Sequence, residues 1–346
     1  MTDWTKGMEQ SYEFWIVDGD SWNDTRQLHN VLSATVVRDS SEETLGHAML
    51  EMTDMIGEEY IRIYLVANGQ RECLGTFLVQ TPGSSFDGKV ETVSVDCYSP
   101  LLELTSDMPP FGYYISEESN IADTIYNIVC AHAHAPMIYA PDAKVLYGPF
   151  VADPTETWLS FASALASRLN SEIALDALGR IYLSPLRDTP SMQPTYTFTD
   201  DNSSILLPDI SDDNDLYGIP NVCEVIYSTK NSVIIGRAVN DDPSSPISTV
   251  SRGRKVLYRE TNPQIENPTQ ETLDAYALQS LRNRSVREHI ITFSHGYCGV
   301  KLGDCVLLKY RRFGLNAKAR IASQSIECST GCTVTATAVY TEAMWT

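Results

Sequence analysis

The stretch from Asp153 to Pro185 constrains the fold most, because its hydrophobic period changes from that of a helix to that of strands. Asp153 is a suitable N-cap, Pro154 suits the first helical position, and Glu156 lies three residues after the cap, where it can reach free backbone donors. Apolar residues then recur at helical spacing and form one stripe: Trp158, Phe161, Ala162, Leu165, Ala166 and Leu169. The sequence therefore predicts a helix over residues 154–169 with one buried face and with Ser160 off the stripe.

A β-hairpin is predicted directly after this helix. Ile173 and Leu175 alternate with polar neighbours, residues 176–180 form a turn, and Ile181 and Leu183 resume the alternation. The hairpin is therefore expected over residues 172–184.

This helix and hairpin together resemble the middle of phage tail and baseplate hub proteins. The resemblance rests on Trp158-Leu159 and Leu165-Ala166 in the helix, the Asp176-x-x-Gly179-Arg180 turn, and a strand that ends with residues 182–185. The family includes trimeric hubs under contractile tails, the late-control D group and spike bases of related bacterial injection machines. Membership implies an α+β, mainly β chain in which a mixed α/β domain lies between two similar, tube-forming antiparallel β-barrels.

Hydrophobic patterning places the domain boundaries of this 346-residue chain, which is long enough for two or three cores. Alternating strands and the Asn68-Gly69 turn predict a first β-barrel domain over residues 1–108, and Pro109 and Pro110 mark its end. The expected mixed domain covers residues 109–189 and includes a helix at 120–133. The second β-barrel domain is expected over residues 190–346, with an inserted loop and helix at about 240–285.

Three segments are harder to assign. Residues 45–55 fit a helix or a strand, and only the family resemblance favours the strand. The polar residues between the strands predicted at 12–17 and 31–37 indicate an irregular loop. The acidic stretch 209–215 is expected to be a solvated loop, and residues 240–253 an exposed one.

The two β regions contain a similar segment about 245 residues apart. Each has a glycine, an acid, a spacer and a strand that ends in tyrosine, and each continues with a second strand, a turn with glycine, and a third strand that begins with threonine. The corresponding residues are Gly57, Glu58 and Tyr64 in the first segment and Gly303, Asp304 and Tyr310 in the second. Such a spacing favours a duplicated barrel over a solenoid repeat, while chance similarity between two hairpins remains the alternative.

Composition limits the function further. The formal net charge of −20 argues against a protein that binds nucleic acid, because binding phosphates requires Lys and Arg to replace their counterions. There is no run of 18 apolar residues, and Met1-Thr2-Asp3-Trp4 does not begin a signal peptide, so no membrane insertion is expected. The eight cysteines include no Cys-x-x-Cys pair and are expected to be reduced thiols; Cys328 and Cys332 flank a turn and are the pair that could form a disulfide.

No catalytic or cofactor motif is apparent. His132 and His134 lack a third metal ligand at suitable spacing, and Cys298 near His295 is no evidence of a thiol nucleophile, because catalytic pairs meet through the fold. Positions 1, 3, 6 and 12 of a possible calcium loop are occupied by Asp213, Asp215, Gly218 and Glu224. However, Tyr217 occupies position 5 and the flanks are not helical, so a solvated acidic loop is expected instead. We expect no enzyme activity, no metal and no cofactor. Because the sequence ends at Thr346, we expect no further C-terminal domain.

The resemblance implies a virion structural protein, made in the host cytoplasm, that forms a homotrimeric ring at the tail tip or baseplate. Expected partners are the tail tube protein, distal tail or baseplate proteins and a spike or tip protein, with the tape measure protein as a further candidate. DNA would pass through the ring without specific binding, past acids such as Glu58, Glu59 and Asp304 that recur in both barrels. The alternatives are a tail-tip cell-wall hydrolase and a β-rich receptor- or carbohydrate-binding protein.

Overall fold

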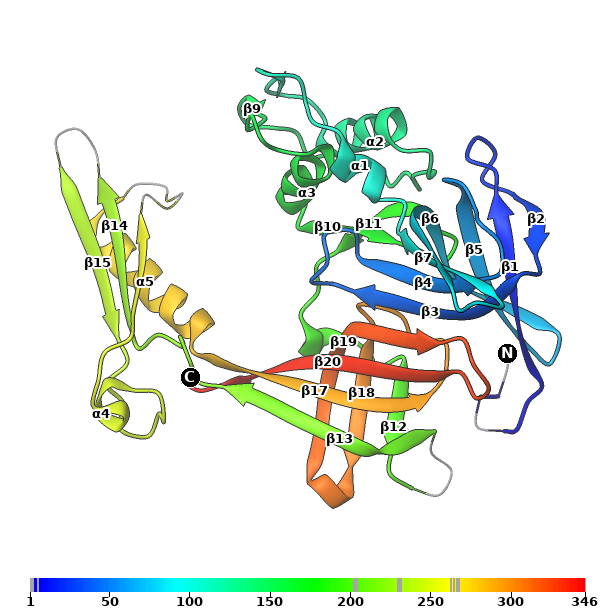
Figure 1. The fold of residues 1–346 in the computed structure, drawn as a ribbon. Coiled ribbons are helices and arrows are strands. Elements are labelled where there is room, and N and C mark those ends of the chain that lie inside the picture. The colour runs from blue at the N-terminus through cyan, green and yellow to red at the C-terminus, as the bar shows by residue number, and fades with distance from the viewer. Residues whose placement is uncertain are drawn as a thin grey trace. The chain divides into compact units, whose positions relative to one another are not determined.

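The structure is a computed structural model that describes residues 3–4, 6–201, 205–228, 232–261, 263, 265 and 268–345. The predictions of no signal peptide and no further C-terminal domain rest partly on residues outside the described ones, namely Met1, Thr2 and Thr346. Strands dominate and most pairs are antiparallel, which confirms the predicted α+β, mainly β class (Figure 1). Internal contacts divide the chain into unit 1, Met1–Ile210 with Phe293–Ala338, and unit 2, Ser211–Thr292 with Val339–Thr346.

The first β region forms an antiparallel sheet. Its strands are β1 (Gln10–Val17), β2 (Asp24–Leu28), β3 (Val31–Asp39), β4 (Gly46–Met52), β5 (Tyr60–Ala67), β6 (Gln70–Phe86) and β7 (Glu91–Tyr98). Their order across the sheet is β3-β4-β7-β6-β5-β1-β2. The turn between β5 and β6 has positive φ at Asn68 (49°) and Gly69 (79°), as a tight hairpin turn of this type requires.

Two of the uncertain segments are resolved by this sheet. The segment at 45–55 contains strand β4, as the resemblance favours. The loop predicted between the first two strands is wrong, because β2 pairs with β1 there. Strand β2 lies at the end of the strand order and buries only Leu28, so its sequence carries no apolar alternation.

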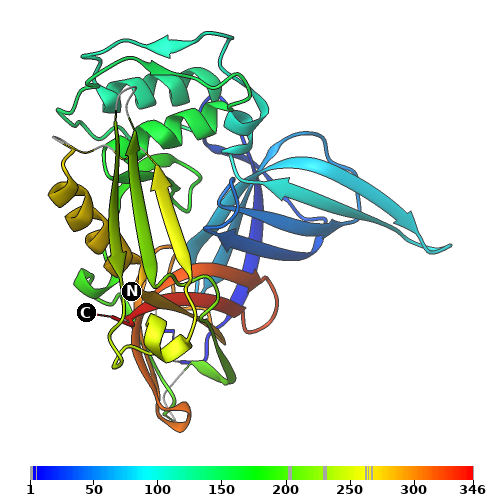
Figure 2. The same ribbon diagram turned by 90° about the vertical axis from the view of Figure 1, so that its left-hand side faces the viewer.

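Strands β6 and β7 continue beyond β5 as a two-stranded ribbon. Pairing of β6 with β5 ends at Leu78, whereas its pairing with β7 continues to Phe86. The register shifts between Val79 and Thr81, so that Gln80 forms a bulge. Residues 81–91 are mostly exposed, and the cyan ribbon that they form extends away from the sheet in Figure 2.

The mixed domain contains the predicted helices and hairpin. Its elements are α1 (Leu102–Ser106), β8 (Tyr114–Ile115), α2 (Ile121–His132), β9 (Phe150–Val151), α3 (Trp158–Arg168), β10 (Ser171–Leu175) and β11 (Ile181–Pro185). Asn120 caps α2 by accepting a hydrogen bond from the N–H of Asp123. The apolar stripe of α3 packs against α2, α1 and β10, and its four predicted core residues are all buried: Trp158, Phe161, Leu165 and Leu169.

Helix α3 begins later than predicted, so the assignment of Asp153 as its N-cap is wrong. The cap is Thr157, whose hydroxyl accepts from the N–H of Ser160 at 3.2 Å, while the Ser160 hydroxyl accepts from the Thr157 N–H at 3.1 Å. Asp153 and Glu156 do interact, because the Glu156 carboxylate accepts from the Asp153 N–H at 3.1 Å. That contact belongs to a turn before the helix, and the sequence pattern does not distinguish the two arrangements.

The second β region repeats the strand order of the first. It contains the 3-10 turn η1 (Thr189–Ser191), β12 (Tyr196–Thr199), β13 (Leu206–Asp215), β17 (Val286–Gly296), β18 (Cys305–Tyr310), η2 (Arg311–Phe313), β19 (Leu315–Glu327) and β20 (Thr333–Ala343). The order β13-β17-β20-β19-β18-β12 corresponds strand for strand to β3-β4-β7-β6-β5-β1. One difference is that β12 and β18 are parallel, whereas β1 and β5 are antiparallel. The two regions form one continuous sheet, because β19 also pairs with β3 (Figure 1).

Unit 2 contains a three-stranded sheet and a helix packed on it. The sheet order is β15-β14-β16, formed by β14 (Val222–Ser228), β15 (Val233–Val239) and β16 (Leu257–Thr261). Helix α5 (Gln270–Arg284) is the helix predicted within the insertion at about 240–285, and it packs against β14 and β15. A Cβ at Gly236 would lie 2.4 Å from the Leu273 carbonyl, so glycine permits this close approach.

Two loop predictions in this part of the chain are wrong. The acidic stretch 209–215 belongs to β13. Residues 240–253 contain the short helix α4 (Thr249–Arg252) and buried polar side chains instead of a fully exposed loop. Asn240 donates from Nδ2 to the Ser245 hydroxyl at 2.9 Å, and such internal satisfaction allows polar residues to be buried.

Candidate functional site

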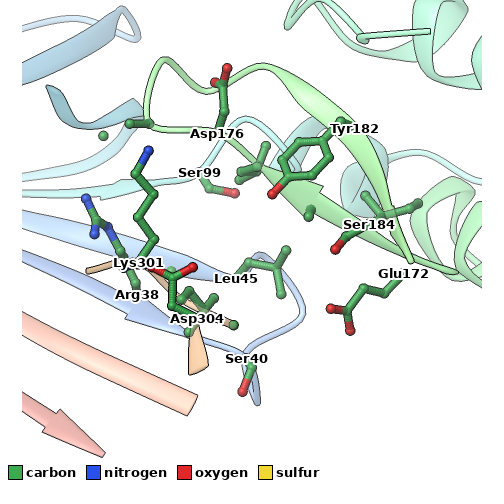
Figure 3. Close-up of a pocket in the computed structure, with 18 of the residues that line it drawn as sticks. Arg38, Ser40, Leu45, Ser99, Glu172, Asp176, Tyr182, Ser184, Lys301 and Asp304 are labelled. Carbon is green, nitrogen blue, oxygen red and sulfur yellow. Dashed lines mark hydrogen bonds between the residues drawn. The ribbon is translucent and has the colours of Figure 1, made fainter. Parts of the chain in front are cut away.

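A cavity of about 580 Å³ lies within unit 1. Its walls come from the β3–β4 corner, the middle of β6, hairpin β10–β11, the loop at residues 301–304, and Arg320 on β19 (Figure 3). The two β regions and the hairpin of the mixed domain thus all contribute to one cavity, which makes it the site to test for binding or catalysis.

Charged side chains in the cavity are mostly fixed by partners within the chain. Arg320 forms an ion pair with Glu172 at 2.5 Å, and Asp176 forms one with Arg180 at 2.7 Å. Arg38 donates to the Leu74 carbonyl at 2.7 Å and to the Gln324 side chain at 3.1 Å. Because these groups are already paired, a bound anion or cation would have to displace existing contacts.

The remaining polar groups do not form a catalytic arrangement. The Asp304 carboxylate accepts from the Lys301 N–H at 2.9 Å, and the Ser99 hydroxyl donates to the Thr44 carbonyl. Burial raises the pKa of the Tyr182 phenol above its usual value, so it is a poorer source of phenolate than a free tyrosine. Among the described residues that line the cavity, none is histidine or cysteine, the usual base and nucleophile at neutral pH. The cavity therefore resembles a joint between packed elements more than an active site.

Arg62 anchors the hairpin of the mixed domain to the first sheet. Its side chain is 5% exposed, pairs with Asp24 at 2.7 Å, and donates to the Thr76 hydroxyl at 2.8 Å and to the Leu178 carbonyl at 3.2 Å. Gly179 follows in the hairpin turn with φ of +76°, and a Cβ there would lie 2.8 Å from Thr76. The hairpin turn is thus fitted closely to β5 and β6, a contact that no local sequence pattern indicates.

The residues of the duplicated segment have different surroundings in the two β regions. Gly303 and Asp304 line the cavity, whereas their proposed counterparts Gly57 and Glu58 do not. Glu58 is exposed and accepts from the Gln80 side chain at 2.7 Å. The two tyrosines also differ, because Tyr64 donates to Asp24 at 2.8 Å and Tyr310 to the Pro208 carbonyl at 2.7 Å.

Each candidate metal-binding histidine is held by its own carboxylate. His132 Nδ1 lies 3.0 Å from Asp107, and His134 Nδ1 lies 2.6 Å from Glu103. No three His, Cys, Asp or Glu side chains converge in a metal-binding arrangement in the described part of the chain.

The four residues considered for a calcium loop are spread along two strands and a turn. Asp213 and Asp215 lie on β13 and Gly218 in the turn after it. Glu224 lies on β14, where it forms an ion pair with Arg259 at 2.8 Å. An extended strand directs successive side chains to opposite faces, so these oxygens do not surround one point.

His295 and Cys298 are close but buried. The two side chains are 3.8 Å apart, burial raises the pKa of the Cys298 thiol to about 12, and burial lowers the pKa of His295 to about 4. Both groups are therefore neutral at pH 7, whereas a cysteine nucleophile must be a thiolate. All eight cysteines, including Cys328 and Cys332, are free thiols in the structure.

The described residues include no helix with the length and apolar character needed to cross a membrane.

Comparison with known proteins identifies the fold. No protein-family model and no curated protein matches the sequence. Among solved structures, a tail protein from Neisseria meningitidis MC58 has a TM-score of 0.69 at 13% identity, covering 96% of this chain and 98% of that one. The 43 kDa tail protein of prophage MuSo2 from Shewanella oneidensis has a TM-score of 0.68 at 13% identity, covering 95% and 98%.

A third similar structure comes from a secretion system. The E. coli c3393 protein, described as a type VI secretion component with structural similarity to the T4 tail proteins gp27 and gp5, has a TM-score of 0.52 at 12% identity, covering 94% of this chain and 76% of that one. The expected resemblance to phage tail hub proteins is thus confirmed at the level of the fold, over nearly the whole chain.

Proposed function

We propose that this chain, which has the fold of phage tail proteins, is a structural hub of a phage tail or phage-like injection device. In this role it forms a trimeric ring that joins the sixfold tail tube to a threefold spike or tip. The observation that carries the proposal is the repeated strand order, in which β13-β17-β20-β19-β18-β12 matches β3-β4-β7-β6-β5-β1.

The repeated order explains how one chain can connect two symmetries. Three copies present six similar β regions to a sixfold tube, while the mixed domain and unit 2 occur three times and suit a threefold partner. Closed rings are also the usual way in which soluble homo-oligomers bury their interfaces. A chain with a single β region would provide no such adapter.

The proposed place of the protein is the virion, at the tail tip or baseplate, after synthesis in the host cytoplasm. Its partners there are the tail tube protein, distal tail or baseplate proteins and a spike or tip protein, with the tape measure protein as a further candidate. The structural relatives described as tail proteins support this setting.

The charge of −20 suits a conduit through which DNA passes without being held. A lining rich in Lys and Arg would bind phosphates by releasing counterions and would slow the passage of DNA. Acids on the ring such as Glu58 and Glu59 would instead repel it at short range, whereas Asp304 lines the cavity within unit 1. Purified rings should therefore not retard DNA in a gel at physiological salt, and retention would contradict the acidic lining while leaving the hub role intact.

We infer that the hub has no enzymatic role, because most charged side chains of the cavity are paired and its described lining residues include no histidine or cysteine. The rival function is a tail-tip cell-wall hydrolase. Incubation with purified peptidoglycan distinguishes the two, since released fragments would support the hydrolase. A receptor- or carbohydrate-binding role would instead appear as binding to host cell envelopes.

The main test is the size and shape of the assembly. Mass measurement and particle images of the purified protein, alone and with a tail tube protein, should show a trimeric ring with a central hole. Monomers or dimers under both conditions would contradict the proposal.

A further inference from the structure

The two β regions are joined inside the chain by an edge contact between strands. Residues Ser323–Glu327 of β19 pair antiparallel with Asp39–Thr35 of β3, beyond the point at which β19 leaves β18. By position in the strand order, β6 corresponds to β19 and β13 corresponds to β3. The edges that correspond to the β19–β3 contact are therefore the edge of β6 beyond Leu78 and the outer edge of β13. Neither edge pairs with a strand in the part of the chain that the structure describes.

The equivalence of β6 and β19 can be followed by residue. On β6 the register with β7 shifts by one residue between Val79 and Thr81, so the two faces of the strand exchange there; this is a change of phase. On β19 the alternation of buried and exposed side chains changes phase after Ile321, where the buried positions move to Gln324 and Ile326. Aligning the two phase changes places Ser84 of β6 at the position of Ile326 of β19.

The equivalence of β13 and β3 follows from their inner neighbours. Leu50 of β4 and Phe293 of β17 are matching core positions on strands with the same place in the order. The Ile205 carbonyl accepts from the Gly296 N–H at 2.9 Å, which fixes the register of β13 on β17. The matching residues are Ala34 with Pro208, Val36 with Ile210, and Arg38 with Asp212.

Backbone groups on both free edges point outward at the matching positions. The Asp87 N–H donates to the Val90 carbonyl across the ribbon, so the backbone of Ser84, three residues earlier, points away from β7. The Ile205 carbonyl points to β17, so the backbone of Ile210, five residues later, points away from it. Both edges therefore offer free donors and acceptors of the kind that another strand can pair with.

We propose that the β6–β7 ribbon of one copy pairs antiparallel with the outer edge of β13 of a second copy, with Ser84 opposite Ile210. This contact would repeat between copies the β19–β3 pairing that exists within the chain. The inference rests on the proposed ring and names the strands that close it. Because one copy uses its ribbon and the next its β13, the contact is head-to-tail and must close into a ring to bury every edge.

Two prolines make this contact weaker than its counterpart within the chain. In the same register, Pro82 lies opposite Asp212, and Pro208 lies opposite Phe86. Neither proline can donate a hydrogen bond, and the Pro208 carbonyl already accepts from the Tyr310 hydroxyl at 2.7 Å. The prolines thus protect the edges from indiscriminate pairing, and they make the ring depend on the tail tube protein or on high protein concentration.

A cross-linking experiment tests the register directly. In a Cys130→Ser background, Ser85→Cys and Asp209→Cys place thiols at directly opposite, exposed positions of the proposed pair, where Cα atoms are about 4.5 Å apart. Mild oxidation of the assembled protein should convert the monomer band to a covalent trimer. The matched control combines Ser85→Cys with Leu207→Cys. These two residues would be diagonal neighbours, about 7 Å apart, and should cross-link poorly.

A second variant tests the hydrogen bonds without the thiols. Ser84→Pro removes only the outward donor of the ribbon, so it should abolish trimers in mass measurements and leave the unfolding temperature unchanged. If trimers form, show no Ser85–Asp209 cross-link and survive Ser84→Pro, the edge contact is wrong and the hub function stands. If no trimer forms with or without the tail tube protein, the hub proposal fails together with it.

Discussion

Replacing Trp158 with alanine tests whether the central helix holds the mixed domain together. The Trp158 side chain is 4% exposed; its ring stacks on His132 at 4.2 Å between centroids and meets the Tyr113 ring edge-on at 5.0 Å. Its indole N–H donates to the Asp107 carboxylate at 3.1 Å. Both the apolar contacts and one hydrogen bond are lost in the variant.

The size of the effect follows from these contacts. Truncating a buried aromatic side chain to alanine costs about 3 to 5 kcal/mol. The lost hydrogen bond adds at most about 1 kcal/mol, because the Asp107 side chain is 58% exposed and water can replace the indole. For a domain of about 150 to 250 residues, a total loss of about 3 to 6 kcal/mol corresponds to a fall in Tm of roughly 6 to 24 °C. Differential scanning calorimetry measures it.

The control must lie on the same helix but away from its structural contacts. Ser160 lies off the apolar stripe, yet it is unsuitable because its hydroxyl and N–H form the capping box with Thr157. Ser160→Ala is therefore expected to cost about 0.5 to 1 kcal/mol, which corrects the expectation from the stripe alone. Ser167 is exposed and its hydroxyl donates to the Ser163 carbonyl of the same helix, so Ser167→Ala should change stability by less than about 0.5 kcal/mol. Equal and small shifts for Trp158→Ala and Ser167→Ala would refute the reasoning.

Three further predictions concern buried and exposed side chains of unit 1. Arg62→Leu leaves Asp24 without its buried partner and should reduce the free energy of unfolding by about 3 to 5 kcal/mol in denaturant titrations. The control Arg26→Leu breaks the exposed pair with Glu59 and should cost less than about 1 kcal/mol. Burial lowers the pKa of His295 from 6.5 to about 4, so the His295 side chain takes up a proton at a higher pH in the unfolded chain than in the folded one. The free energy of unfolding should therefore decrease between pH 6.5 and 4 by roughly 3 kcal/mol more than in His295→Gln. Identical pH profiles for the two proteins would exclude this contribution of His295. Cys130 is exposed, whereas burial raises the pKa of Cys73, Cys97, Cys298 and Cys328 to about 12. A thiol reagent should therefore show one fast phase that Cys130→Ser removes, and several fast phases would argue against the burial of the others.

Local patterns predicted the elements whose own residues carry the signal. The alternation of Ile61, Ile63 and Leu65 indicates a half-buried strand, and the stripe from Trp158 to Leu169 indicates a helix packed on one side. The Asn68-Gly69 turn is set by the positive φ that these two residues tolerate. In each case the physical cause lies within a few residues of its effect.

Features that depend on distant partners could not be predicted in this way. Arg62 is buried because Asp24 and the Leu178 carbonyl satisfy it, and these lie 38 and 116 residues away. The acidic strand β13 has no apolar alternation, yet it is held beside β17, where Asp212 contacts His289 at 2.9 Å within unit 2. The cavity was missed for the same reason, since Arg38, Glu172 and Arg320 meet only through the fold.

The repeated strand order also explains where unit 2 enters the chain. Strands β3 and β4 are connected by the short turn at residues 40–45, whereas their counterparts β13 and β17 are connected by residues 216–285. A hairpin turn tolerates a long insertion because its two strands hold each other in register on either side, so the closure cost grows only slowly with loop length. The insertion has its own sheet and its own apolar cluster, centred on Leu273, Ala277 and Leu281 of α5. One long insertion at one turn of the repeated strand order therefore makes the two β regions of one chain unequal. In the proposed ring of three, it would convert six similar positions into three that carry unit 2 and three that do not.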